Sequence, residues 1–599
     1  MILTIDLRVD PSCGHRAQFV IKTGGVVVPQ ISEWIGWRRT PQGLYTAPTW
    51  PTSVLGVAPS PSVQVQWSEA ATAQRDRLLA DLNGARTMLK LGHSPIETPT
   101  ERKPRQHQLQ AVHAMRHMGW RVLLADDMGL GKTSSALWAV RDAKVPTLLV
   151  VCPVSVKFNW KNEIDTTLGF DHWPTVVING TAKQRADQIA LAKSIASGPG
   201  HTAVVINYDL LLHLSDEQSA WLHTFASRGM VLFDESHYLK SGKAKRTQEC
   251  QGIAAHARHV SCLTGTPIRN LADDLFTQVE LVRPGTWTSY RDFAKRYLVI
   301  QSVKFGKRDV QKVVGTRNLD ELNAVMNTVQ IKRSKAEAID LPPKIRTYPE
   351  LELEGDLLKL YRAMREFARL ELSKLGDAKL NVFDPRAKSA VEQAMRCEQI
   401  AQGFIGGIPD PVMAQLGADV LKHAEKIPGR PNELIFPNAP KILWLLEAIE
   451  SVRAQGGAPL VFSRFNAPMF WLRQKLHQDT GMYVATLHGG LSAEDKDGAV
   501  QSFQKGELDV LIAQVKMAEG WNAFRSQDVL FLGRDWSPFI NYQAEDRAHR
   551  MGQKGTVNVQ IPISRKTVEV MIDRRLRAKD ADANQALRTV TIAELMEAL

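Results

Sequence analysis

The sequence predicts an α/β protein with two tandem parallel-sheet lobes, a helical insertion between them and a small β-rich domain in front. Short apolar runs rich in β-branched residues alternate with helical stretches from residue 121 to residue 266, and the same alternation returns after Lys441. Runs of this kind are typical of strands buried on both faces of a parallel sheet. Between the two regions the pattern changes to long helical stretches, such as GDLLKLYRAMREFARLELSKL, and proline-broken loops.

The bulk properties fit a globular protein with several cores. A chain of 599 residues has room for three or four domains. Its formal charge of +12 is a weak signal of a polyanionic partner, because a mild basic excess on so long a chain is more often only a solvated surface. The five cysteines are scattered without a CxxC pair, which argues against a zinc site or a disulfide framework. No signal segment or membrane-spanning run is visible, so we expect a cytoplasmic protein with no membrane partner.

We expect five segments along the chain. Residues 1–98 read as strands followed by a helix and form an accessory domain. Its tryptophans are interpreted as core residues, with base stacking as the alternative: Trp34, Trp37, Trp50 and Trp67. Residues 99–285 form the first lobe, 286–440 a linker with the helical insertion, 441–575 the second lobe and 576–599 a helical tail.

The stretch RVLLADDMGLGKT, residues 121–133, predicts a phosphate-binding loop between a strand and a helix. Backbone N–H groups and the helix N-terminus can bind phosphate, Lys132 reaches the β- and γ-phosphates, and Thr133 offers a hydroxyl to Mg²⁺. The predicted nucleotide contacts are Asp127, Met128, Gly129, Leu130, Gly131, Lys132 and Thr133. The common form of the motif has a glycine where this chain has Asp126, and a lone GKT is a weak signal. The strand before it and the helix after it strengthen the prediction.

A carboxylate pair, Asp234 and Glu235, follows the apolar run MVLF. The C-terminal edge of a parallel sheet is where a bound nucleotide would meet this pair. Asp234 suits the anchoring of a metal ion and Glu235 the orientation of the attacking water. The next strand ends in LTGTPIRN, where Thr264 and Thr266 are candidates for coupling the metal site to the second lobe. A tight turn without a catalytic role is the alternative for that stretch.

In the second lobe, the stretch QAEDRAHRMGQ places Arg547 and Arg550 three residues apart, which predicts one face of a short helix. Arginines supplied across a cleft can stabilise charge on the γ-phosphate during hydrolysis, by roughly a thousandfold or more. The alternative is a solvated basic helix face, because arginines at this spacing are common.

Together these segments resemble the Swi/Snf-type DNA translocases of helicase superfamily two, over roughly residues 103–575. PRQHQLQAV resembles the adenine-reading block, which implies that Arg105 and Gln108 contact the nucleotide. DDMGLGKT resembles the family's phosphate loop, in which an acidic residue replaces the first glycine and accounts for Asp126. LLVVCPVSVKFNWKNEI, VVINYDLL, DESH and LTGTPIRN follow in the family's order, and IKRSKAEAIDLPPKIRTYPELEL is the most discriminating stretch.

RDWSPFINYQAEDRAHRMGQ resembles the family's closing block, with Arg547 and Arg550 in the arginine-finger positions and Gln543 as a coupling residue. IAQVKMAEGWNAF keeps Gly520 as a nucleotide contact, but Met517 and Ala518 replace a glycine pair, which puts local DNA contacts in doubt. Gln106 in place of proline and DESH in place of DEGH or DEAH are further departures.

The resemblance implies two RecA-like lobes and an ATP-dependent translocase that acts on double-stranded DNA, branched DNA included. ATP and Mg²⁺ would bind between the lobes, and the candidate DNA contacts are Ser155, Lys157 and Arg464. A monomeric motor from a small prokaryotic or viral member of the family is expected, in the bacterial cytosol and nucleoid or in the cytosol of an infected host. A strand-separating DNA or RNA helicase is the alternative. A binding scaffold without catalysis is disfavoured, because the catalytic residues are intact.

Overall fold

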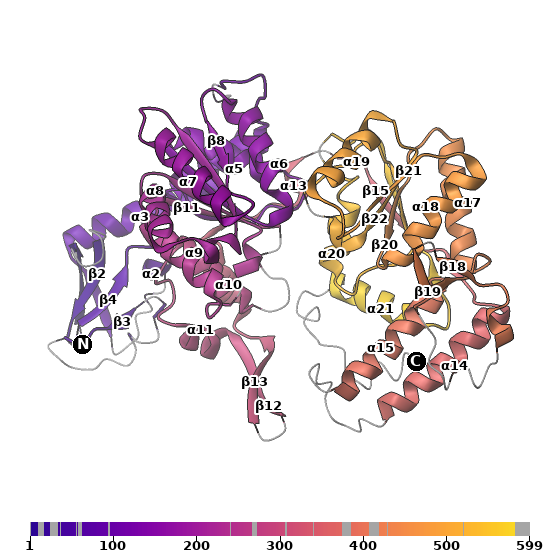
Figure 1. Ribbon diagram of the computed structural model, residues 1–599. Helices are drawn as coiled ribbons and strands as arrows, with labels where there is room; N and C mark the ends of the chain where they lie inside the picture. Colours follow the sequence, from indigo (N-terminus) through magenta and orange to yellow (C-terminus); the bar gives the residue numbers. More distant parts are fainter. Residues whose placement is uncertain are drawn as a thin grey trace. The chain divides into compact units, whose positions relative to one another are not determined.

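The computed structural model forms two compact units, Met1–Ile339 and Asp340–Leu599 (Figure 1). It describes residues 2–9, 17–23, 31, 34–35, 37–42, 44–55, 57, 63–93, 96, 98–239, 241–265, 267, 272–305, 308–339, 341–373, 385–406, 412, 418–427, 429–518, 520–550 and 552–581. Within this part of the chain, none of the helices is both long enough and apolar enough to cross a membrane.

The first lobe is built on a parallel sheet with the strand order β14-β6-β11-β10-β7-β9-β8. Its strands are β6 Arg121–Leu124, β7 Thr147–Cys152, β8 Thr175–Val177, β9 Thr202–Asn207, β10 Met230–Asp234, β11 His259–Leu263 and β14 Gln330–Ile331. Val122 and Leu124 enter one apolar cluster, whereas Leu123 and Ala125 enter another. The sheet is therefore covered on both faces, as its continuous apolar runs predict.

The helices around this sheet are α4 Gln106–His117, α5 Lys132–Asp142, α6 Lys157–Ile164, α7 Ala182–Ala196, α8 Asp216–Ser227, α9 Lys245–His256 and α10 Asp274–Val282. Arg121, at the start of β6, is buried beneath them. Its guanidinium group donates to four backbone carbonyl groups at the C-terminal ends of α9 and α10, those of Ala254, Ala257, Leu281 and Val282. A cation is favourable there, because helix C-termini carry unpaired carbonyl groups and partial negative charge. This contact fixes the strand that leads into the phosphate loop.

The N-terminal domain is a mixed sheet with the order β3-β4-β2-β1-β5, packed against α3. Its elements are β1 Ile2–Val9, β2 Ala17–Lys22, β3 Arg38–Arg39, β4 Leu44–Pro48, α2 Pro51–Leu55, β5 Gln64–Trp67 and α3 Glu69–Met88. Trp34 and Trp37 lie in its core, and Trp67 packs against that core. Trp50 instead joins the domain to the first lobe: its Nε1 donates to the Pro284 carbonyl at 2.9 Å, and the Arg283 guanidinium lies 4.7 Å from its ring centre.

The segment expected to form one insertion, residues 286–440, is divided between the two units. Its first part contains α11 Tyr290–Tyr297, the hairpin β12 Leu298–Phe305 and β13 Arg308–Thr316, and α12 Leu319–Met326. It ends with β14, which pairs in parallel with β6 at the edge of the first sheet. Its later part begins with β15 Lys344–Thr347, which pairs with β24 in the second sheet. Strands this short give no recognisable period in the sequence.

The second lobe is a parallel sheet with the order β15-β24-β23-β20-β22-β21. The strands are β15, β20 Leu460–Ser463, β21 Val484–Leu487, β22 Val510–Gln514, β23 Asp528–Phe531 and β24 Val557–Gln560. The helices of this lobe are α17 Pro440–Ala454, α18 Asn466–Thr480, α19 Ala493–Lys505, α20 Pro538–Glu545 and α21 Val568–Ala581. The expected helical tail is helical to Ala581, and residues 582–599 lie outside the described part.

The helical insertion proper belongs to the second unit. Helices α14 Gly355–Ser373 and α15 Pro385–Ala401 pack against each other (Figure 1), and the short strands are β16 Glu350–Leu351, β17 Phe404–Ile405, β18 Glu425–Ile427, β19 Arg430–Ile435 and β25 Ile563–Ser564. Residues of α14, α15, α17, α18 and α21 share one apolar cluster with the sheet.

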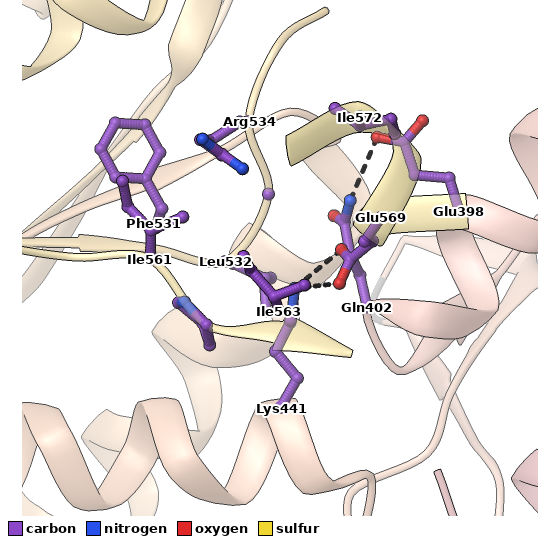
Figure 2. A pocket seen from close by; sticks show the side chains of 12 residues that line it. Glu398, Gln402, Lys441, Phe531, Leu532, Arg534, Ile561, Ile563, Glu569 and Ile572 are labelled. Atoms are coloured by element: carbon purple, nitrogen blue, oxygen red, sulfur yellow. Dashed lines mark hydrogen bonds and ion pairs between the residues drawn. The ribbon is translucent and has the colours of Figure 1, made fainter. Parts of the chain in front are cut away.

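A buried polar network lies where α15, α17 and α21 meet, and Figure 2 shows two of its pairs, Lys441 with Glu569 and Glu398 with Gln402. The Lys441 ammonium group donates to both carboxylate oxygens of Glu569, at 2.7 and 2.6 Å. The Glu398 carboxylate accepts from Arg464 at 2.5 Å and from Trp536 Nε1 at 3.0 Å. Burial raises the pKa of Glu398 and lowers the pKa of Lys441. The cavity between them, about 20 Å³, has room for roughly one water molecule, so the network is structural.

Candidate functional site

The phosphate loop connects β6 to α5 through two glycines in left-handed conformations. Gly129 has a φ of 85° and Gly131 a φ of 75°, values that side chains strongly disfavour. Lys132 is the first residue of α5, so the loop ends at a helix N-terminus. The Lys132 ammonium group donates to the carbonyl groups of Asp126 and Asp127, at 2.8 and 3.3 Å. This is the strand–turn–helix geometry expected of a triphosphate-binding loop.

Asp126, at the position of the missing glycine, forms a buried ion pair with Arg333. Its carboxylate is 1% exposed and accepts from Arg333 Nε at 3.1 Å and from Nη2 at 2.5 Å. Arg333 also donates to the His107 carbonyl at 2.7 Å, and His107 Nε2 donates to the Leu130 carbonyl at 2.9 Å. Asp126 is therefore part of a hydrogen-bond network that runs through Arg333 and His107 to the phosphate loop. The sequence showed both residues but gave no sign that they pair, since they are 207 positions apart.

The carboxylate pair lies at the end of β10, as the sequence predicts. Asp234 is held by Trp160, whose Nε1 donates to Oδ2 at 2.7 Å, and by the Glu235 backbone N–H, which donates to Oδ1 at 3.0 Å. Glu235 adopts a φ of 47°, unusual for a side chain of its size and typical of strained functional positions. Burial, with the Glu235 charge adding to it, raises the pKa of Asp234 to about 7.

Lys132 belongs to the same electrostatic site. Burial lowers the pKa of Lys132, whereas Glu235, Asp126, Asp234 and Asp127 raise it. The cation of the phosphate loop and the acids at the end of β10 therefore lie within mutual electrostatic reach in one lobe.

Thr264 and Gly265, which directly follow β11, lie close to the acidic pair and to the phosphate loop, respectively. His237 is fully buried between Glu235, whose Oε2 lies 3.1 Å from Nδ1, and the Thr264 hydroxyl, which also lies 3.1 Å from Nδ1. A Cβ atom on Gly265 would come within 2.7 Å of Met128 Cγ and 3.3 Å of Lys132 Nζ, so only glycine allows this approach to the loop. Thr264 is thus joined to Glu235 through His237, a link that the sequence did not reveal. Thr266 lies outside the described residues.

The predicted adenine-reading block forms the start of α4. Gln108 is buried, and its Oε1 accepts from the Arg105 backbone N–H at 2.9 Å, which caps the helix. Arg105 itself is exposed. These residues lie next to the hydrogen-bond network of the phosphate loop, because His107 between them bonds to Leu130.

The donor set at the loop fits Mg²⁺ bound together with phosphates. Thr133 and Asp234 offer a hydroxyl and a carboxylate, the hard oxygen ligands that Mg²⁺ prefers, and Mg²⁺ commonly takes its remaining ligands from substrate phosphates and water. Among the residues that the structure describes, no group of three or more His, Cys, Asp or Glu side chains could hold a metal ion alone. A metal that arrives with the nucleotide agrees with both observations.

In the second unit, Arg547 and Arg550 lie in a turn and not on one helical face, so that prediction was wrong. Helix α20 ends at Glu545. Arg547 then folds back: Nε donates to the Gln543 carbonyl at 3.1 Å and Nη1 to the Trp521 carbonyl at 2.6 Å. Arg550 Nη1 donates to Asn522 Oδ1.

These contacts join the arginine turn to the loop that contains Gly520, whose φ of 84° requires glycine. Gln543 is buried in α20. The Gln543 carbonyl accepts from Arg547 Nε. The coupling role predicted for Gln543 stays a prediction.

Two of the three predicted DNA contacts are engaged inside the protein. Lys157 is 2% exposed and donates to the Ile178 carbonyl and to Asn179 Oδ1, at 3.2 and 2.7 Å. Arg464 pairs with the buried Glu398. Both cations are therefore already paired within the protein, and their role as phosphate contacts stays a prediction. Ser155 is exposed and remains a candidate.

The second unit carries a basic–aromatic cluster that the sequence did not reveal, formed by Arg430, Phe470, Arg473, His488 and Lys496. The Arg430 guanidinium lies 5.0 Å from the Phe470 ring centre, and Phe470 meets His488 edge to face at 5.1 Å. Burial and the charges of Lys496, Arg430 and Arg473 lower the pKa of His488. The adjacent Gly489 and Gly490 are exposed. Arginine and lysine beside aromatic rings and open backbone suit contact with a nucleic-acid backbone.

Comparison with protein-family models identifies the family of the chain. The family model for the SNF2-related domain matches residues 106–402, and that for the helicase conserved C-terminal domain matches residues 440–552. Together they cover about two thirds of the chain.

Among curated proteins, the DNA annealing helicase and endonuclease ZRANB3 of Mus musculus is 27% identical over 472 residues, which are 78% of this chain and 39% of that protein. The putative ATP-dependent helicase/translocase YwqA of Bacillus subtilis is 24% identical over 523 residues, 86% of this chain and 51% of that protein. The chain thus spans about two fifths to one half of the length of these relatives.

Among solved structures, the Sulfolobus solfataricus SWI2/SNF2 ATPase core in complex with dsDNA matches 82% of this chain and 94% of that chain, with 24% identity and a TM-score of 0.36. The first family model contains every strand of the first sheet, the phosphate loop, Asp234 and Glu235, and continues into the helical insertion of the second unit. The second model contains β20, β21, β22 and β23 of the second sheet. The chain therefore belongs to the SNF2-related ATPases, enzymes with a helicase C-terminal domain that hydrolyse ATP.

Proposed function

We propose that this ATPase is a motor that uses ATP hydrolysis to move along or remodel double-stranded DNA. The observation that carries the proposal is that one unit bears both the arginine turn and the basic–aromatic cluster around His488. A unit that contacts DNA and also supplies the arginines for hydrolysis would couple the two events. The curated relatives named as an annealing helicase and as a helicase/translocase agree with such a motor.

ATP would bind to the phosphate loop with Lys132 on its β- and γ-phosphates. Thr133 and Asp234 would hold Mg²⁺, which neutralises phosphate charge when bound. Glu235 would orient the attacking water, with His237 fixing its carboxylate. Arg547 and Arg550 would reach the γ-phosphate when the two lobes close, and the resulting cycle of closing and opening would advance the DNA contacts in turn.

Contacts of this kind recognise phosphates and not bases. Arg473, Lys496 and Arg430 would bind the backbone of the duplex, so affinity would depend on salt and not on sequence. Ser155 of the first unit would add a contact from its exposed turn. The annealing activity in the name of one relative suggests branched DNA as a substrate. A strand-separating DNA or RNA helicase remains the alternative.

The test is ATP turnover with duplex DNA, branched DNA, single-stranded DNA or RNA, followed by displacement of a third strand from a DNA triplex. We expect the largest stimulation with duplex or branched DNA, and ATP-dependent triplex displacement. Glu235→Gln should lower turnover by roughly a hundredfold or more, since it removes the group that orients the water. Glu217→Gln is the matched control, because that carboxylate is 86% exposed on the same lobe.

The DNA contacts are tested by Arg473→Ala. The log–log slope of DNA affinity against salt concentration should fall by about one, uniformly across sequences. Stimulation by RNA or single strands alone would favour the helicase alternative. Turnover that neither duplex DNA nor Glu235→Gln changes would contradict the proposal.

A further inference from the structure

The first unit contains a cavity of about 310 Å³ where the N-terminal sheet meets the loop that follows α10. Pockets that bind small molecules have volumes of about 300–1,000 Å³, so the cavity is large enough to hold a ligand. The described residues that line it come from positions 17–50 and 280–288, so the cavity is separate from the phosphate loop.

The strands of the small sheet direct polar side chains to this cavity. Phe19 and Tyr45 lie in the apolar core of the N-terminal domain, on one face of the sheet. Their neighbours Gln18 and Thr46 lie on the opposite face, because successive side chains of a strand alternate, and both line the cavity. Arg38 pairs with Thr46 across the strands, so it lies on the cavity face as well.

Two tryptophans give the cavity aromatic walls. Of the tryptophans for which the sequence left base stacking open, Trp50 lines the cavity. Its ring is fixed, because Nε1 donates to the Pro284 carbonyl and the buried Arg283 guanidinium lies 4.7 Å from the ring centre. Trp287, 4% exposed, packs against Phe293 with ring centres 4.7 Å apart. Rings held in place in this way suit the stacking of a flat aromatic ligand.

Glu280 places an oriented carboxylate at the cavity. Oε2 accepts from the Gly285 N–H at 2.8 Å, and Oε1 accepts from the Trp287 N–H at 3.3 Å. A carboxylate has about four lone-pair positions, so capacity for a further donor remains. Burial raises the pKa of Glu280 to about 7, although the backbone donors and the Arg38 charge lower it. At neutral pH the group is therefore present both as an acceptor and as a donor.

The charges around the cavity favour an anionic aromatic ligand over a cationic one. Arg38 is an exposed lining residue, and Arg283 lies against Trp50, whereas Glu280 is partly protonated near pH 7. A nucleotide combines a flat ring, hydrogen-bonding groups on the ring edge and a phosphate that a guanidinium group can bind. A base inside a duplex is stacked and paired, so it must leave the stack before it can enter a cavity.

We propose that this cavity binds one unpaired nucleotide of a DNA strand, with the base against Trp50 and Trp287, the base edge at Glu280 and the phosphate at Arg38. The N-terminal domain and the first lobe thus form a second nucleotide site, which recognises strand ends and branch points, where unpaired nucleotides occur. This inference rests on the proposed function only in taking DNA as the source of the nucleotide.

The experiment measures DNA binding to the full chain by fluorescence anisotropy, without ATP. One duplex is blunt, and a second duplex of the same sequence carries a two-nucleotide unpaired overhang. Arg38→Gln removes the charge at the cavity, and Thr288→Trp narrows the cavity from an exposed position. Arg39→Gln is the matched control, because that exposed arginine follows Arg38 on β3 and pairs with the core residue Tyr45 on the other face.

We expect the parent to bind the overhang duplex about tenfold more tightly than the blunt one, within the range that the stacking of one base contributes. Arg38→Gln and Thr288→Trp should each reduce this preference to less than about threefold and leave the affinity for the blunt duplex within about twofold of the parent. Arg39→Gln should keep the preference. Excess dCMP should remove the preference without displacing the blunt duplex.

An overhang preference that survives both cavity variants would overturn the inference, as would equal binding of the two duplexes by the parent. Binding of dCMP without any overhang preference would overturn the assignment to a DNA strand. If the blunt duplex is bound and only the preference is missing, this inference fails and the proposed function stands. If neither DNA is bound, both fail.

Discussion

The pairing of Asp126 with Arg333 makes a quantitative prediction about the variant Arg333→Met. The substitution removes the guanidinium group but keeps a long apolar side chain in the same space. The Asp126 carboxylate, 1% exposed, then loses both of its bonds to that group. The His107 carbonyl loses a donor at 2.7 Å as well.

The expected effect follows from burial. Breaking a buried ion pair by removing one partner destabilises by about 3–5 kcal/mol, and the lost bond to the carbonyl adds about 1 kcal/mol. The double variant Asp126→Gly/Arg333→Met removes both charges and introduces the glycine of the common motif. Its loss should be only about 1–2 kcal/mol, so the two substitutions should be strongly non-additive.

Amide hydrogen exchange of β6 measures the free energy that the Asp126–Arg333 pair contributes. The Leu123 and Ala125 amides donate to the carbonyl groups of Val329 and Ile331, in the segment that leads to Arg333, so their protection reports whether that segment stays attached to β6. Protection of residues 121–127 should fall by about a hundredfold or more in Arg333→Met and recover most of the way in the double variant. Arg185→Met is the control, because that arginine is exposed and donates to the Gly180 carbonyl five residues before it. If the double variant exchanged as fast as Arg333→Met, the ion pair would not be the source of the stability and the reasoning would be refuted.

Three further predictions follow from other contacts. Trp160→Phe removes the donor to Asp234 Oδ2, so the Mg²⁺ concentration for half-maximal turnover should rise about tenfold, and an unchanged Mg²⁺ titration would contradict this role. Burial raises the pKa of Glu280 to about 7, so the folded state retains a proton that the unfolded state loses above about pH 4.5, and stability should fall by up to about 3 kcal/mol as the pH rises from 5 to 8. Glu280→Gln should flatten this part of the stability–pH curve, and an equal slope in both proteins would count against the raised pKa. Arg121→Met should destabilise the first lobe by about 3–5 kcal/mol in thermal unfolding, because four buried carbonyl groups lose their donor, whereas a loss under about 1 kcal/mol would show that water replaces the guanidinium.

The strands and the phosphate loop could be predicted because their sequence signal is local. A strand buried on both faces must be apolar along its whole length, as Val122–Leu124 and Met230–Phe233 are, whatever its neighbours are. Gly129 and Gly131 adopt backbone conformations that other residues avoid, so their spacing alone marks the turn. Asp234 and Glu235 are identified by their position directly after such a strand.

Charged residues were predicted less well, because their environment depends on distant partners. Lys157 and Arg464 looked like surface contacts, yet Asn179 and Glu398 hold them inside the fold. The arginine turn looked helical because its spacing is helical, but helix α20 ends at Glu545. Beyond it, the Arg547 guanidinium donates to the Trp521 carbonyl and the Arg547 carbonyl accepts from the Ala523 N–H. No local pattern shows which partner a charge will find.

The sequence by itself thus determined the two α/β lobes, the phosphate loop and the acidic pair at the end of β10, since burial and backbone geometry constrain residue type position by position. Only the tertiary structure decided that Arg333 joins Asp126, that Lys344 joins Glu545 and that His237 joins Glu235 to Thr264. Three of these four contacts close loops of at least 27 residues, and two of them loops of about 200. Burying either charge alone costs free energy, and that cost is offset only when folding brings both partners together.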